Sequence, residues 1–166
     1  MKKLFLPSIG VLFLLVSCGP TKDDAITFND RIVSAQKKCL NAEGDFYNVC
    51  DKLNPDDIKK ALEDLKTSVT ACAAKAAKVE AHEDFDAYKQ SAINLISAYK
   101  GMLDKEFSEY ARLYSISSEE YSEKDEADQK ELAAKINTSL DLLNKNFIAE
   151  QKRFAAKWGF SLEKSY

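Results

Sequence analysis

Cysteine and histidine are the residues of this chain that could carry chemistry, and both are few. The 166 residues include four cysteines and one histidine, His82. A di-iron helical bundle needs Glu-x-x-His on two helices, whereas Val79 stands three residues before His82. No Cys-x-x-Cys-His segment, Gly-x-Ser-x-Gly turn or glycine-rich phosphate loop occurs. We therefore expect no metal, no cofactor and no enzymatic activity.

His82 leaves two alternatives to that expectation. It stands among three acids, Glu80, Glu83 and Asp84, which together form a weak candidate cation site. A solvated helix end explains the same cluster, because charged side chains commonly cap helices. An enzyme with an unfamiliar nucleophilic site would also have to use this histidine.

The first cysteine, Cys18, ends an apolar leader. Two lysines open the chain, and the apolar run over 4–16 is shorter than the roughly 20 residues that a membrane-spanning helix needs. Leu15-Val16-Ser17-Cys18 resembles the lipobox of bacterial lipoprotein precursors. The resemblance implies that residues 1–17 are a signal peptide and that cleavage frees Cys18 for acylation with palmitate-type chains, which would hold the protein on a membrane. The alternative is an ordinary secretory signal in which Cys18 falls near the cut.

Residues 18–24 are expected to form a lipidated tether. Gly19 is not the acidic residue associated with retention at the inner membrane, which favours the outer membrane. Lys22-Asp23-Asp24 resembles a surface-export signal of lipoproteins in some diderm bacteria, although a solvated linker has the same composition. We expect an outer-membrane lipoprotein that faces either the periplasm or the cell surface, with the surface favoured.

Apolar residues that recur three and four positions apart predict four long helices. The low content of glycine (5) and proline (3) agrees with an all-α fold and argues against an all-β one. The helices are expected over 25–53, 55–80, 85–114 and 123–159, with a tail at 161–166. Asp84 is the expected N-cap of the third helix, and the capping-box-like spacing of Ser122 and Asp125 predicts the start of the fourth. The sequence thus predicts one domain over 25–160, an antiparallel up-down-up-down four-helix bundle.

A single register lets the first two apolar stripes face each other around the turn between them. It pairs Val49 with Leu62, and Cys39 with Cys72. Disulfides persist outside the cytosol, so we predict a Cys39–Cys72 bond, which requires Cα atoms about 4.4–6.8 Å apart. The alternative is two small core residues in contact without a bond. Cys50 lies about 16 Å along the helix from Cys39 and is left as a free thiol or an intermolecular link.

Four tyrosines recur every eleven residues, which is three helical turns: Tyr88, Tyr99, Tyr110 and Tyr121. The first three form a stripe on the third helix. Such a stripe could line a cleft between the helical hairpins for a peptide or an apolar ligand. The alternative is that the rings flank the core with their hydroxyls in water.

The charge and motif content point to a binding role without catalysis. A net charge of −3 with mixed signs makes nucleic acid a poor candidate partner. We expect a non-enzymatic interaction module for a protein, envelope or host partner. The second hypothesis is a carrier of small or apolar ligands that uses the tyrosine-lined cleft.

The first helix also carries a weak family resemblance. Asn29-Asp30, followed by Ile32, Val33 and Gln36, looks like an uncharacterised family of helical bacterial surface lipoproteins. The resemblance brings no catalytic residue. Apart from the resemblance, the positions of Asn29 and Gln36 beside the apolar stripe suit them either as interhelical hydrogen-bond partners or as a binding site.

Overall fold

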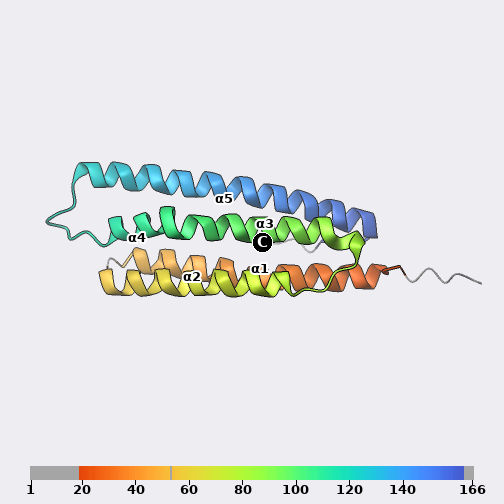
Figure 1. Ribbon diagram of the computed structural model, residues 1–166. Coiled ribbons are helices and arrows are strands. Elements are labelled where there is room, and N and C mark those ends of the chain that lie inside the picture. Colours follow the sequence, from red (N-terminus) through yellow and green to blue (C-terminus); the bar gives the residue numbers. More distant parts are fainter. Residues whose placement is uncertain (1–18, 53, 163–166) are drawn as a thin grey trace, which may run out of the picture.

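All regular structure in the described part of the chain is helical. The computed structural model describes residues 19–52 and 54–162, and no strand occurs within them. The elements in chain order are α1 (Lys22–Cys50), α2 (Pro55–Ala77), the 3-10 turn η1 (Glu83–Phe85), α3 (Asp86–Met102), the π turn η2 (Leu103–Phe107), α4 (Ser108–Tyr114) and α5 (Glu123–Trp158). The predicted all-α class is confirmed, and the helices form an elongated bundle (Figure 1).

The first helix starts and ends three residues earlier than expected. It begins at Lys22 and ends at Cys50, while Leu53, the expected last residue, lies outside the described residues. The residue before a proline is disfavoured in helical conformation, and Asn54 is extended, with φ −96° and ψ 112°. Its side-chain oxygen accepts hydrogen bonds from the backbone N–H groups of Asp56 and Asp57, at 3.1 and 3.3 Å. These bonds begin α2 and separate it from α1.

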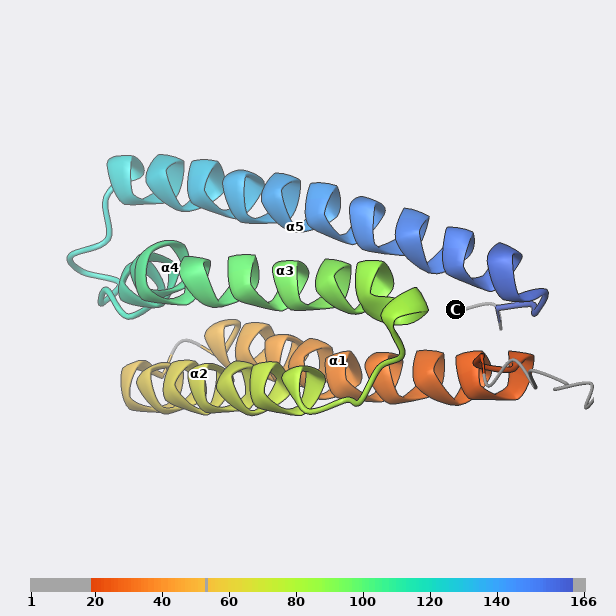
Figure 2. The ribbon, with the colours of Figure 1, turned by 45° about the vertical axis from the view of Figure 1, so that its right-hand side comes forward.

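Helices α1 and α2 lie side by side along the lower part of both ribbon views (Figures 1 and 2). The predicted bond between Cys39 and Cys72 is present, with the Cα atoms 6.4 Å apart. Farther along, the Lys75 ammonium donates to the Ser34 hydroxyl at 2.9 Å. The register expected from the apolar stripes is therefore correct at the disulfide. Helix α2 stops at Ala77 instead of residue 80.

The third expected helix, 85–114, is divided by a π turn. Between α3 and α4, the backbone hydrogen bonds of η2 join residues five positions apart, instead of the four of an α-helix. The Ser108 hydroxyl also donates to the Leu103 carbonyl at 2.8 Å. Both Leu103 and Phe107 are buried, so the π turn keeps two large side chains of the same segment in the core.

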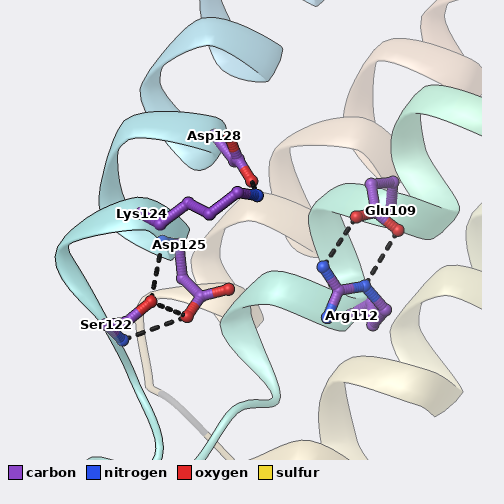
Figure 3. Close-up of polar contacts among 6 residues, drawn as sticks. All are labelled: Glu109, Arg112, Ser122, Lys124, Asp125 and Asp128. Atoms are coloured by element: carbon purple, nitrogen blue, oxygen red, sulfur yellow. Dashed lines mark hydrogen bonds and ion pairs between the residues drawn. The ribbon is translucent and has the colours of Figure 1, made fainter.

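Helix α5 has the capping signals that the sequence predicted. Asp125 donates its backbone N–H to the Ser122 hydroxyl at 3.3 Å, and Ser122 donates its own N–H to the Asp125 carboxylate at 3.0 Å (Figure 3). On the neighbouring α4, Arg112 makes two hydrogen bonds to Glu109. The helix ends at Trp158, one residue earlier than expected, because Gly159 is left-handed with φ 69°.

The buried side chains form two separate clusters. The proximal core lies near the start of α1 and contains Ala25, Phe28, Ile32, Val79, Phe85, Tyr88, Ala92, Phe147 and Phe154. The distal core fills the remainder and is built mainly by α1, α2 and the α3–η2–α4 segment, with Ile136 as its only fully buried residue from α5. In both ribbon views α5 approaches α1 toward its own C-terminal end, where the proximal core lies (Figures 1 and 2).

Candidate anchoring site at the N-terminal end of the bundle

Helix α1 begins at Lys22, four positions after Cys18, the cysteine of the predicted lipobox. Thr21 and Asp24 form a capping box: the Asp24 N–H donates to the Thr21 hydroxyl at 3.2 Å, and the Thr21 N–H donates to the Asp24 carboxylate at 2.8 Å. The Thr21 hydroxyl also donates to the Asp24 carboxylate at 2.7 Å, and this bond, together with the one from the Thr21 N–H, holds the pKa of Asp24 below its ordinary value. Cys18 itself lies outside the described residues, and only Gly19, Pro20 and Thr21 separate it from α1.

This geometry corrects the expected tether of residues 18–24. Lys22, Asp23 and Asp24 form the first turn of α1 instead of a linker, and two acids there complement the positive end of the helix dipole. The connection from Cys18 to the helix is therefore much shorter than expected. A role of these three residues in export stays a prediction.

His82 has a structural position in the connection between α2 and α3. Its Nδ1 accepts the backbone N–H of Asp84 at 3.2 Å, so it caps η1 in the place that the sequence assigned to Asp84. Asp84 instead receives the ammonium of Lys157 at 2.7 Å, which lowers the pKa of the carboxylate and links the connection to α5. Across residues 19–52 and 54–162, no group of three or more His, Cys, Asp or Glu side chains could hold a metal ion.

A surface depression of about 410 Å³ lies where the start of α1 meets this connection. Its walls include Gly19, Pro20, Thr27, Phe28, Arg31, Glu80, His82 and Phe85. Phe28 and Phe85 are almost wholly buried beneath it, with ring centroids 4.9 Å apart. The sequence singled out Glu80 and His82 as part of a weak candidate cation site, but it contained no signal that Arg31 would join them, because Arg31 comes from a separate segment.

The proximal core supports the floor of the depression. Phe85 meets Phe154 at 5.2 Å and the single tryptophan, Trp158, at 5.3 Å between ring centroids, both edge to face. Three further contacts of Phe154 join it to Phe28, Tyr88 and Phe160. This aromatic cluster fixes the end of α5 against the beginning of α1.

A buried polar node joins three helices beside the same core. The Asn29 side-chain oxygen accepts from the Tyr88 hydroxyl at 3.0 Å and from the Gln151 amide at 2.9 Å. Asn29 is thus an interhelical hydrogen-bond partner, as the sequence predicted, whereas the Gln36 amide nitrogen is buried and has no partner among the described residues. Gln151 was missed, although its place between Phe147 and Phe154 on the inward face was a usable signal.

The three tyrosines expected to line a cleft are core residues. Tyr88, Tyr99 and Tyr110 are only 2%, 6% and 8% exposed, and their rings pack in the proximal or distal core. The depression above and a second one of about 560 Å³ beside Ala87 and Ile93 are both lined by other residues. The rings therefore fill the interior between the helices in this structure, instead of opening a cleft or exposing their hydroxyls.

The bonded and free cysteines are those that the helix register predicted. Cys39 and Cys72 are bonded to each other, and Cys50 is a free thiol that is 1% exposed. Burial raises the pKa of the Cys50 thiol to about 12. A protonated and inaccessible thiol is a poor nucleophile, so Cys50 acts as a small core residue.

Comparison with known proteins does not identify the chain. No protein-family model, curated protein or solved structure matches it. The resemblance of the first helix to helical surface lipoproteins therefore stays a prediction. None of the helices within 19–52 and 54–162 is long and apolar enough to cross a bilayer.

Proposed function

We propose that the protein is a lipid-anchored, non-enzymatic module that acyl chains on Cys18 hold at the outer membrane. The observation that carries this proposal is the start of α1 at Lys22, next to the lipobox. Three intervening residues span at most about 10 Å at 3.3 Å each, so an acylated Cys18 would hold the bundle against the membrane. Several acyl chains anchor stably, since each buried CH₂ contributes about 0.8 kcal/mol.

In this proposal the fold is an antiparallel, up-down-up-down four-helix bundle, in which α3, η2 and α4 act as one helix. The Cys39–Cys72 bond and the Lys75–Ser34 contact support opposite directions for α1 and α2. The proximity of Asn29 to both Tyr88 and Gln151 supports the placement of the other two helices. Such a bundle is a rigid body with broad helical faces.

A macromolecular partner in the envelope or outside the cell is the function that these features fit best. The polar groups that a catalytic site could have used have structural tasks: His82 caps a turn, Asp84 pairs with Lys157, and Asn29 joins helices. The carrier hypothesis has less support, because the residues expected to line its cleft, Tyr88, Tyr99 and Tyr110, are buried in the core. A rigid body on a short anchor is suited to presenting a surface.

Labelling with an alkyne analogue of palmitate tests the anchor. Wild-type protein should carry the label, and Cys18→Ala should lose it and run as the uncleaved precursor. Cys50→Ala is the matched control, because Cys50 is a buried cysteine outside the Cys39–Cys72 bond; this variant should keep the label. Label that persists in Cys18→Ala, or is absent from wild type, would contradict the proposal.

Protease treatment of intact cells tests the side of the membrane. Loss of the bundle when protease is added to intact cells would place it on the cell surface, and the partner is then sought in the host, the matrix or neighbouring cells. Protection until the outer membrane is opened places it in the periplasm, and the partner is then sought in the envelope.

A further inference from the structure

Besides His82, three charged side chains line the depression at the anchored end of the bundle: Asp24, Arg31 and Glu80. The Asp24 carboxylate already accepts hydrogen bonds from the Thr21 hydroxyl and N–H, at 2.7 and 2.8 Å, which leaves Arg31 and Glu80 as two unpaired charges of opposite sign. Arg31 on α1 and Glu80 after α2 both line it, and neither makes an ion pair or a side-chain hydrogen bond with any residue within 19–52 and 54–162. Two free charges over an aromatic floor of Phe28 and Phe85 are an arrangement suited to a small zwitterion.

The Arg31 guanidinium and the Glu80 carboxylate each select one charged group of that zwitterion. A guanidinium binds phosphate oxygens through two parallel N–H donors, which a lysine ammonium cannot do. A carboxylate binds a primary ammonium by charge-assisted hydrogen bonds. The buried rings of Phe28 and Phe85 leave an apolar base on which the carbon chain between phosphate and amine can rest.

The position of the depression indicates that its ligand comes from the membrane. Gly19 and Pro20, the two residues that follow the lipobox cysteine, form part of its wall. If Cys18 is acylated, the depression lies at the level of the lipid headgroups. From these observations we infer that it binds a phosphoethanolamine group, with Arg31 on the phosphate and Glu80 on the ammonium. This inference rests on the proposed anchor for its lipid source, but not for its chemistry.

A titration of the detergent-solubilised full chain with glycerophosphoethanolamine tests the chemistry. Trp158 is the natural probe, because it is the only tryptophan and its ring meets Phe85 at 5.3 Å. We expect a saturable change of its fluorescence, with glycerol 3-phosphate and ethanolamine each binding at least about tenfold more weakly. The absence of a saturable change would overturn the site.

Two variants with matched controls locate the binding. Arg31→Gln and Glu80→Gln should each raise the half-saturation concentration about tenfold or more, by removal of one charge-assisted contact. Lys78→Gln and Glu83→Gln change exposed neighbours that do not line the depression and should bind as wild type does. If Arg31→Gln and Glu80→Gln bind like these controls, the assignment is wrong.

Vesicles distinguish the membrane source from a soluble one. In phosphatidylethanolamine vesicles the lipid headgroups should already occupy the site, so added glycerophosphoethanolamine should leave Trp158 fluorescence unchanged. In phosphatidylglycerol vesicles the site should be empty, and added glycerophosphoethanolamine should still change the fluorescence. Equal responses in both would support the site and assign it to a soluble phosphodiester. The mass of the Cys18 peptide reports acylation separately, so an unacylated chain that binds the probe would overturn the anchor and keep the site.

Discussion

The proximal and distal cores hold the same helices together by different means. In the proximal core, α5 contributes Phe147 and Phe154, which pack against aromatic rings of α1, η1 and α3. In the distal core, α1 and α2 are joined by the Cys39–Cys72 bond, and α5 contributes one fully buried side chain, Ile136. The large aromatic side chains that α5 buries are therefore in its C-terminal half, at the end of the bundle where α1 begins, while Leu132, Ala133 and Leu140 pack only partly buried on the distal core.

The two cores also differ in how their polar groups are satisfied. Near the proximal core, Tyr88 and Gln151 both donate to Asn29. In the distal core, the Tyr99 hydroxyl is buried and meets no hydrogen-bond partner among the described residues. The nearby Glu43 carboxylate and, to a larger extent, burial raise the pKa of that hydroxyl. The contrast therefore holds for Tyr88 and Tyr99 but not for every polar atom, because the Trp158 Nε1 at the proximal core is also buried without a partner among the described residues.

The largest expected effect comes from the aromatic attachment of α5. Phe154→Ala should lower the free energy of unfolding by about 3–5 kcal/mol, because it removes a ring that contacts several others in the proximal core. Leu142→Ala on the same helix is the control; this side chain is 62% exposed, and its loss should cost no more than about 0.5 kcal/mol. Urea unfolding of the detergent-solubilised full chain measures both, and equal effects would contradict the account of how α5 is held.

The disulfide should dominate the stability of the distal core. Replacing Cys39 and Cys72 together by alanine should cost about 2–4 kcal/mol, since the bond closes a loop with a sequence separation of 33 residues. Cys50→Ala, which removes a buried but unbonded thiol, is the comparison. Thermal unfolding with and without reductant checks the result: reductant should destabilise the wild type and leave the double variant unchanged. If reductant destabilised the double variant as much as the wild type, the destabilisation would not come from the Cys39–Cys72 bond.

Two tyrosine substitutions test whether the Tyr88 and Tyr99 hydroxyls differ in hydrogen bonding. Tyr88→Phe should cost about 0.5–1.5 kcal/mol, because it removes a hydrogen bond to the Asn29 oxygen. Tyr99→Phe should be neutral or slightly stabilising, because its hydroxyl is buried without a partner. Chemical denaturation of both variants tests the difference. A cost at Tyr99 equal to that at Tyr88 would mean that the Tyr99 hydroxyl is satisfied in solution.

The smallest expected effect depends on pH. Burial raises the pKa of Glu43, so the folded chain holds a proton more readily than the unfolded chain does. Stability from this group is present below the ordinary carboxyl pKa and falls as pH rises through the raised one. Glu43→Gln should therefore be more stable than wild type at pH 7 and close to it at pH 4. Melting temperatures at the two pH values measure this, and a stabilisation that is larger at pH 4 would reverse the assigned sign.

The helices and the disulfide were predictable because they depend on local and repeating features. The apolar spacing aligned Cys39 with Cys72, and the Ser122–Asp125 spacing located the start of α5. The capping box of Thr21 and Asp24 was equally visible, but the charged residues between them were interpreted as a linker. The π turn was not predictable from periodicity, because one inserted residue preserves the buried pattern on either side.

The candidate site was only partly predictable, for a different reason. The role of Cys18 rests on a contiguous motif and stays a prediction, whereas Arg31 and Glu80 meet in one depression only after α1 and α2 pack together. The tyrosine repeat showed that three rings share a helix face, but not whether that face is covered. Burial of Tyr88 and Tyr99 depends on helices distant in sequence.

The most direct test of the account is the mass of the protein extracted from its own membranes. We predict a mature chain that begins at Cys18, carries acyl chains on that residue, and retains the Cys39–Cys72 bond. Tandem fragmentation should assign the added mass to the peptide that contains Cys18, Gly19 and Pro20. An intact leader, or a mature N-terminus elsewhere without acyl mass, would contradict the anchor on which the proposed function depends.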